Sequence, residues 1–375
     1  MPPVTIDGTN GITTPMYSGA ISANAVTPVN SFKNRIINGN MSVDQRNAGA
    51  SVTAVDGTYT LDRWQTYSTP ASKFSVQQNA GSVTPPVGFK NYLGATSLSA
   101  YSVTSNDYFT VGQAIEGFNV ADLEFGTANA KTITISFWVR SSLTGTFGAG
   151  VTNSAFNRSF PFSYTINSAN TWEQKSVTIA GDTSGTWLTN NGRGLELDFG
   201  IGVGSTNSGT AGSWQSGWKP SVTGATNIVG TNGATFYITG VQLEVGSTAT
   251  SFDYRPYGTE LALCQRYFFN VGGQIYSTAS SGGTAYLTTW CFGLVKSPVT
   301  MRAMPTFTKT GNWNWNDYNA VNTNTGALTF RSTSSTLDAF WIASEGTSSG
   351  LTALQAYFLT AANDATARLS FSAEL

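Results

Sequence analysis

The chain has 375 residues, enough for two domains with separate cores or for one very large sandwich. Only 10% of the residues are charged and the formal net charge is -1, which argues against a basic surface that would attract nucleic acid or an anionic membrane. Histidine is absent, so the commonest general base and the commonest metal ligand are missing, and most classes of enzyme are disfavoured.

The composition favours many short strands. Glycine, at 40 residues, and aromatic residues, at 13%, are typical of strands joined by tight turns. The two cysteines, Cys264 and Cys291, are too few for a disulfide framework, and we expect both to be small core residues. No charged segment followed by an apolar one opens the chain, and no apolar run approaches the length of a membrane span. We therefore expect a soluble protein that is not exported by a cleaved signal, with no membrane insertion and no nucleic-acid partner.

Residues 1–32 are rich in Thr, Asn, Gly and Pro, with only isolated apolar residues. Such a segment buries too little surface to fold alone. Two interpretations stay open. The segment is either a disordered tail or an extended arm that becomes ordered on a partner protein or on neighbouring copies of the chain.

Residues 33–256 are predicted to form one large β-sandwich. In residues 133–139 apolar residues alternate with others, as in a strand with one buried face. Apart from one short helical turn expected at residues 114–118, no helical period interrupts the series, which indicates an antiparallel sandwich of the jelly-roll type. The clearest expected strands are residues 58–67, 74–78, 95–103, 132–140, 160–166, 173–179, 195–203 and 235–245.

The stretch from residue 233 to 269 predicts the joint between two domains. Its first part alternates apolar and polar residues like a half-buried strand, with a bulge at Gly240 where the alternation slips by one. Pro256 then ends the sheet, because proline lacks an amide donor. A short helix is expected to follow, with Thr259 as its cap. One mostly apolar helix face is assigned to Leu261, Cys264, Gln265 and Phe268.

Residues 257–375 are predicted to contain this linking helix and a second, smaller β-sandwich. No fixed-period repeat is present, which argues against a β-helix or a propeller. The expected fold is therefore all-β: a jelly-roll β-sandwich, a short helix and a second, smaller β-sandwich, preceded by an extended N-terminal arm. The strands expected in the second sandwich are residues 285–295, 299–308, 328–331, 339–343, 354–359 and 367–375.

Several segments resemble known families. The strand ITGVQLEVGS (residues 238–247) and the following ATSFDYRPYGTELALCQRYF (residues 249–268) are similar to a signature of tail-fibre and related virion proteins of bacteriophages. Residues 34–64, which begin NRIINGN and end LDRW, resemble the start of the same proteins. Together with the terminal strand ARLSFSAEL, these motifs bracket nearly the whole chain after residue 33. The segments TITISFWVRSS, WEQKSVTI and FYITGVQLE are similar to strands of the jelly rolls of carbohydrate-binding modules.

The phage resemblance implies a virion structural protein, most directly a tail fibre or tail-tip adhesin. It also implies a homotrimer that is made in the host cytoplasm and located on the phage particle. Residues 1–32 would attach it to other virion proteins, and the distal domain would bind a host cell-surface carbohydrate. Two alternatives stay open: a capsid-decorating or baseplate structural protein with no receptor of its own, and a glycan depolymerase.

Tryptophans in two segments are candidates for glycan binding. Trp313 and Trp315 alternate with asparagine in residues 311–319, which we expect to be an exposed loop. Rigid aromatic faces suit the C–H faces of sugar rings, while neighbouring amides and carboxylates suit hydroxyls. The alternative is a subunit contact, with both tryptophans buried in a trimer. The full set of candidates is Trp313, Trp315, Asp317, Tyr318, Trp214 and Trp218.

Catalytic signatures are missing from the sequence. A glycosidase needs two carboxylates across a cleft, and no pair of acidic residues has a signature spacing. Glu196 and Asp198 share one strand face, which we interpret as a solvated face. No nucleophile elbow, Cys–His pair or phosphate-binding glycine loop is found. We therefore expect no enzymatic activity.

A structural calcium ion is a weaker expectation, and it comes from the resemblance to carbohydrate-binding modules. Their jelly rolls often hold calcium near the first and last strands, where this chain has Asn38, Asn40, Asp44 and Asp253. Hard cations prefer several carboxylates and carbonyls, so the set is thin. The alternative is that these residues form turns. No other cofactor is expected.

Three arginines are expected to make structural contacts. Arg63 is expected to pair with Asp62 at a strand end. Arg255 is expected to lock the joint between the domains. For both of these segments the alternative is a contact point between chains. Arg266 has Glu260 as a candidate partner, although a spacing of six residues is poor for an ion pair on a helix.

Overall fold

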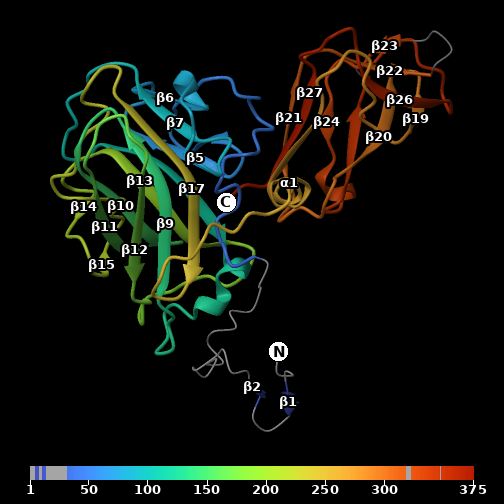
Figure 1. Ribbon diagram of the computed structural model, residues 1–375. Helices are drawn as coiled ribbons and strands as arrows, with labels where there is room; N and C mark the ends of the chain where they lie inside the picture. Colours follow the sequence, from blue (N-terminus) through green and yellow to red (C-terminus); the bar gives the residue numbers. More distant parts are fainter. Residues whose placement is uncertain (1–4, 8–10, 14–31, 318–321, 347) are drawn as a thin grey trace.

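The computed structural model describes residues 5–7, 11–13, 32–317, 322–346 and 348–375. It contains two β-sandwiches, built from residues 52–245 and 268–372, with α1 (Tyr257–Gln265) between them (Figure 1). The prediction of an all-β fold with a jelly-roll sandwich, a short helix and a second, smaller sandwich is confirmed. In the described ranges, no helix has both the length and the apolar character needed to cross a membrane.

Two antiparallel sheets form the first sandwich. In order across the first sheet, its strands are β15 (Gln215–Ser216), β11 (Arg158–Ile166), β10 (Gly145–Asn153), β13 (Arg193–Val203), β8 (Tyr108–Glu116), β5 (Trp64–Ser68) and β4 (Thr58–Leu61). The second sheet has the order β12 (Glu173–Ile179), β9 (Ile133–Ser141), β17 (Thr235–Val245), β7 (Leu93–Ser97), β6 (Phe74–Gln78) and β3 (Val52–Thr53). A short parallel pair, β14 (Ser208–Gly209) and β16 (Ser221–Val222), and three 3-10 turns, η1 (Ala80–Ser82), η2 (Gly117–Asn119) and η3 (Ala121–Leu123), complete this part.

The core of the first sandwich lies between these sheets. The alternation in β9 places Ile135 and Phe137 inside, where Phe137 meets Phe199 of the opposite sheet at 4.9 Å between ring centroids. β8 and β10 were not predicted, because both of their faces are almost entirely buried and neither shows a clean alternation. The helical turn expected at residues 114–118 is only partly right, since β8 continues to Glu116 and η2 starts at Gly117.

Gly240 forms the predicted bulge in β17. The register between β17 and β9 shifts between Thr239 and Gln242, and Gly240 has a φ of 60°. A Cβ atom at this position would lie 2.5 Å from Cζ of Phe89. Glycine is therefore required both by the left-handed backbone and by the close approach of the Phe89 ring.

The second sandwich packs a small sheet against a large one. The small sheet has the order β18 (Phe268–Gly272), β27 (Arg368–Ser372) and β21 (Thr306–Thr310). The large sheet has the order β23 (Asn322–Asn324), β22 (Trp313–Asn316), β26 (Ala356–Ala361), β19 (Gly283–Leu287), β20 (Trp290–Lys296), β25 (Ala339–Ser344) and β24 (Thr329–Phe330), and η4 (Ser332–Ser334) follows β24. Phe371 stacks at 4.9 Å on both Phe269 and Phe340, so aromatic rings fill this core.

Helix α1 begins earlier than the sequence predicted. It starts at Tyr257, and the backbone oxygen of Pro256 accepts hydrogen bonds from the amides of Thr259 and Glu260. Thr259 is therefore inside the first turn and is not the cap. Phe268 was assigned to the helix face but lies in β18.

Two short strands are described in the predicted arm. β1 (Thr5–Asp7) and β2 (Gly11–Thr13) pair antiparallel, with Ile6 opposite Ile12. This part is therefore a paired hairpin. Most of the arm predicted for residues 1–32 lies outside the described residues.

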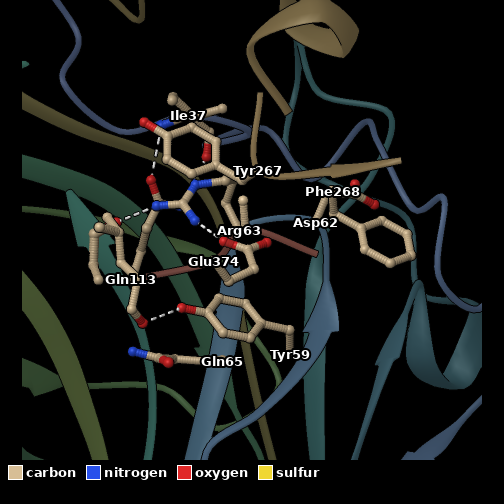
Figure 2. Close-up of polar contacts among 12 residues, drawn as sticks. Ile37, Tyr59, Asp62, Arg63, Gln65, Gln113, Tyr267, Phe268 and Glu374 are labelled. Atoms are coloured by element: carbon tan, nitrogen blue, oxygen red, sulfur yellow. Dashed lines mark hydrogen bonds and ion pairs between the residues drawn. The ribbon is translucent and has the colours of Figure 1, made fainter. Parts of the chain in front are cut away.

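Figure 2 shows how the end of the chain enters the first sandwich. Glu374 forms ion pairs with Arg63 and, at 2.8 Å, with Arg46. Arg63 is only 1% exposed, and its guanidinium lies 3.7 Å from the ring centroid of Tyr267. The predicted Arg63–Asp62 pair is wrong, because Asp62 instead accepts hydrogen bonds from the amide and the side chain of Gln45, both at 2.6 Å.

A second buried contact joins α1 to the first sandwich. Glu116 accepts hydrogen bonds from Arg266 at 2.6 and 2.9 Å and from the Tyr267 hydroxyl at 2.6 Å. Glu260 pairs with Arg255 rather than with Arg266, which corrects the expected partner. Arg255 also donates to the backbone oxygen of Ile36 at 3.2 Å, as expected for a residue that locks the joint.

Three segments that are distant in sequence meet at this joint. Residues 34–64 supply Arg46 and Arg63, residues 249–268 supply α1 and Tyr267, and Glu374 comes from the terminal segment. These segments therefore form one connected cluster of buried charges and aromatic rings.

Candidate functional site

An open hollow of about 420 Å³ lies on the outer face of the large sheet of the second sandwich. It spans β19, β20 and β25, which are neighbours in the sheet, and the segment after β24. Four of its ten lining residues are aromatic, and one ion pair lies at the rim. The lining residues are Tyr286, Trp290, Cys291, Phe292, Arg331, Ser334, Trp341, Ala343, Ser344 and Glu345.

The strand alternation explains why aromatic side chains face outward here. In β20, Cys291 and Val295 are buried in the core, whereas Trp290 and Phe292 point to the other face and stay half-buried. In β25, Phe340 points inward and Trp341 outward. The core is therefore filled from one face of the sheet, and a second set of apolar side chains is left on the outer face.

Two tilted rings form the walls of the hollow. The ring centroids of Phe292 and Trp341 lie 5.3 Å apart, with 58° between the ring planes. Ala343 lies directly opposite Phe292 in the strand register, so the small methyl group leaves space between the larger side chains. Tyr286, which is 60% exposed, stands at the edge from β19.

An ion pair forms the polar rim. Nε of Arg331 donates to Oε1 of Glu345 at 2.8 Å, and the Thr329 hydroxyl donates to the same oxygen at 3.2 Å. Aromatic faces beside groups that can donate and accept hydrogen bonds suit a ligand with apolar faces and many hydroxyls. Burial raises the pKa of the Cys291 thiol to about 12, so this thiol stays protonated and does not act as a nucleophile.

The predicted glycan-binding tryptophans Trp313 and Trp315 are not in an exposed loop. They lie in β22, paired with Ala361 and Leu359 of β26, and are 1% and 0% exposed. Because they alternate with asparagine, both point to the same side, and that side is the core. Neither ring offers a face to a ligand. Nε1 of Trp315 donates to the Ser344 hydroxyl at 2.7 Å and thereby supports β25 from the core side.

The other predicted site residues are not brought together with them. Asp317 accepts a hydrogen bond from Gln355 at 2.7 Å, and Tyr318 lies outside the described residues. Trp214 and Trp218 belong to the first sandwich. Trp214 packs against Trp187 at 5.4 Å and donates to the backbone oxygen of Ala180.

Trp218 covers a buried pair of carboxylates on the outer face of β13. Glu196 and Asp198 were expected on a solvated face, but both are fully buried, which corrects that interpretation. Nε1 of Trp218 donates to Asp198 at 3.2 Å, and Arg193 pairs with Glu196 at 2.6 Å. Burial, together with the nearby Glu196, raises the pKa of Asp198 well above its usual value.

Oxygens of three of the four residues considered for calcium already accept hydrogen bonds from backbone N–H groups. Oδ1 of Asn38 accepts the Val43 amide at 2.9 Å, and the two oxygens of Asp44 accept backbone amides of the following turn at 2.7 and 3.0 Å. Asp253 accepts the amide of Asn34. These N–H groups direct positive charge at the oxygens that would hold a metal, and the described part of the chain holds no cluster of three or more acidic or cysteine ligands. The fourth candidate, Asn40, is half-buried, and its Oδ1 is buried without a hydrogen-bond partner among the described residues.

Sequence reasoning did not single out Trp290, Phe292 and Trp341. The usable signal was in residues 290–296, WCFGLVK, which are apolar at nearly every position. In a sheet with one open face, such a strand leaves apolar side chains on the outside. The strands that complete the hollow are distant in sequence, so the local pattern alone could not place it.

No protein-family model matches this sequence, and no curated protein matches it. Among solved structures, the chain is similar to the enzymatically active domain of tailspike protein 4 from bacteriophage CBA120, with 12% identity, 57% of this chain and 22% of that chain covered and a TM-score of 0.30. It is also similar to TmCBM61 in complex with β-1,4-galactotriose. The identity is 11%, the match covers 57% of this chain and 99% of that chain, and the TM-score is 0.29. A family 11 carbohydrate-binding module from Clostridium thermocellum gives 13% identity, 53% and 97% coverage and a TM-score of 0.27.

Proposed function

We propose that this protein is a non-catalytic adhesin that binds a glycan in the hollow of its second sandwich. The observation that carries the proposal is the group of outward-facing aromatic rings around Ala343, beside the Arg331–Glu345 pair. Side chains of this kind supply a large contact area at low entropic cost. A sheet that already fills its core has no structural need for a second apolar face, so these rings favour a binding role.

The proposed place of this adhesin is a bacteriophage particle, as a tail fibre or tail-tip protein. The resemblance of residues 34–64 and 249–268 to such proteins supports this assignment. Residues 1–32 would connect the protein to other virion components, and the second sandwich would face the host cell. Assembly into a homotrimer belongs to the same proposal.

The absence of catalysis is also part of the proposal. Among the described residues that line the hollow, Glu345 is the one carboxylate, and it is held by Arg331. A glycosidase ordinarily uses two carboxylates on either side of the scissile bond. The other close pair, Glu196 and Asp198, is buried beneath Trp218 and is not open to a polysaccharide.

Two tyrosines of equal exposure provide a matched test. Tyr286 in the hollow is 60% exposed and Tyr257 at the start of α1 is 61% exposed. Purified wild-type protein, Tyr286→Ala, Trp341→Ala and Tyr257→Ala would be applied to a microarray of defined bacterial oligosaccharides and to host cells. We expect Trp341→Ala and Tyr286→Ala to lose binding and Tyr257→Ala to retain it, with all variants folded by circular dichroism.

Two results would contradict the proposal. Binding that persists in Trp341→Ala would place the glycan site elsewhere on the protein. A folded wild-type protein that binds neither the array nor host cells, and does not block phage adsorption, would favour a structural protein without a receptor. Release of shortened glycan products would instead identify a depolymerase.

A further inference from the structure

The charge of the hollow defines the class of sugar that it accepts. We infer, building on the proposed function, that the hollow selects uncharged sugar units over acidic ones, and that Glu345 enforces this selection by neutralising Arg331. Arg331 and Glu345 are the two charged residues among those described in the lining, so the lining has no net charge. A site built for uronic acids or phosphate would instead need a cation free to pair with the ligand.

The geometry of the pair shows how the neutralisation works. Oε1 of Glu345 accepts from Nε of Arg331 and from the Thr329 hydroxyl, which holds the carboxylate beside the guanidinium. A negatively charged sugar that approached Arg331 would also approach Glu345, and the repulsion would offset the attraction. A hydroxyl group, by contrast, can donate to the carboxylate and accept from the guanidinium without any loss of charge pairing.

The angle between the aromatic rings further limits the class of sugar that the hollow accepts. Phe292 and Trp341 stand at 58° to each other, so one flat ligand surface cannot stack on both. Their ring centroids are 5.3 Å apart, so the two rings pack on each other, and a sugar ring can stack on the open face of one of them and touch the edge of the other. The hollow therefore fits one or a few units of a soluble, uncharged glycan rather than the flat face of an ordered polysaccharide.

A charge-removing variant tests this inference. Glu345→Gln keeps the shape and an acceptor oxygen but leaves Arg331 as an unpaired cation. Neutral hexose oligosaccharides and uronic-acid oligosaccharides of equal length would be titrated into wild-type protein, Glu345→Gln and Trp341→Ala, at low and high salt. We expect wild-type protein to prefer the neutral series by at least about fivefold, and Glu345→Gln to lose or reverse that preference. The new binding of uronates should weaken as salt increases.

The outcomes separate the inference from the proposed function. Wild-type protein that binds uronates as well as neutral sugars, or a Glu345→Gln variant with an unchanged preference, would overturn the inference while the hollow remains a glycan site. If neither series binds to folded wild-type protein, or if Trp341→Ala binds like wild type, the proposed function fails and the inference fails with it. Urea unfolding of each variant would establish that binding is compared between folded proteins.

Discussion

Arg266, directly after α1, donates two hydrogen bonds to Glu116, at the end of β8, with N–O distances of 2.6 and 2.9 Å. Glu116 is almost completely buried and also accepts the hydroxyl of Tyr267. Its charge is therefore compensated inside the joint and not by solvent. Together with the Arg63–Glu374 pair, which Figure 2 shows, this contact ties the second sandwich to the first.

Replacing Glu116 is expected to weaken the joint. Glu116→Gln removes the charge that faces Arg266, whose side chain is only partly screened by solvent. We expect the free energy of unfolding to fall by about 2 kcal/mol, as for a lost charge-assisted hydrogen bond in a partly buried setting. Urea denaturation would measure the change. Glu345→Gln, which breaks an exposed pair, is the control and should change it by less than about 0.5 kcal/mol; equal effects of the two variants would contradict the interpretation.

The stability of the protein should fall in acid. Burial alone would raise the pKa of Glu116, but its hydrogen bonds to Arg266 and Tyr267 outweigh burial and lower the pKa. At Glu173, hydrogen bonds from Lys175 and from residues 167–168 likewise outweigh burial and lower the pKa from 4.5 to about 2.

A lowered folded-state pKa means that the stabilisation exists above the unfolded-state pKa and is lost as the pH falls through the folded-state pKa. We expect the free energy of unfolding of the wild type to decrease between about pH 4.5 and pH 2, with a shallower decrease in Glu116→Gln. Identical slopes for the two proteins would exclude Glu116 as a contributor.

The buried carboxyl group of Asp198 should make the protein less stable as the pH rises, which is opposite to the effect of Glu116. Burial and the nearby Glu196 raise the pKa of Asp198, so its contribution is fully present below the unfolded-state pKa and is lost as the pH rises. Asp198→Asn removes this dependence and keeps an acceptor for Trp218. We expect the variant to be more stable than wild type at about pH 8 by at least about 1 kcal/mol, and similar near pH 4. A variant that is less stable at both values would show that the charge is needed.

Trp315 should be essential for folding and not a ligand contact. It is fully buried and donates to Ser344, so Trp315→Ala would leave a large cavity behind β25 and remove one partner of the Ser344 hydroxyl, which keeps its bond to the Ser348 hydroxyl at 2.6 Å. We expect a loss of about 3–5 kcal/mol in the free energy of unfolding. Tyr286→Ala is the control, because an exposed tyrosine contributes little to the core. If Trp315→Ala kept the stability of the wild type and lost only glycan binding, this result would contradict the claim that the Trp315 side chain is buried in the core.

A comparison of Gly240 with Gly233 distinguishes two reasons why a position requires glycine: a left-handed backbone and a close neighbouring side chain. Gly240→Ala adds a methyl group 2.5 Å from the Phe89 ring in a backbone with a φ of 60°, whereas Gly233→Ala has a φ of 74° with nothing within 4 Å. We expect Gly233→Ala to cost about 1 kcal/mol from backbone strain alone and Gly240→Ala about 1–3 kcal/mol more from the clash. Thermal unfolding would measure both. Equal losses would mean that the Phe89 ring moves aside.

Strands whose sequences alternate could be predicted from the sequence. The expected ranges 173–179 and 235–245 coincide with β12 and β17, because alternation of apolar and polar residues is a local property, and it is present in β17 although both faces of that strand are buried. β10 was missed because its outer face is covered by a distant loop: Cβ atoms at Gly148 and Gly150 would lie 2.2 Å from Ser221 and Lys219. No local sequence pattern indicates that a distant loop covers the outer face of a strand.

The candidate site was harder to predict for the same reason. The alternation of tryptophan and asparagine in residues 313–316 shows that both rings share a face, but only the neighbouring β26 shows that this face is the core. The hollow combines side chains from residues 286 to 345, and the joint pairs Arg63 with a residue 311 positions later. Contacts at such separations depend on the packed fold and are not visible in a local pattern.

The central claim, that the hollow around Trp341 binds a glycan, is tested most directly by calorimetric titration of a glycan-array ligand into wild-type protein and Trp341→Ala. We predict a single site in the wild type and a dissociation constant at least about tenfold higher in the variant, because Trp341 forms one wall of the hollow. An unchanged dissociation constant in a folded Trp341→Ala protein would contradict the account.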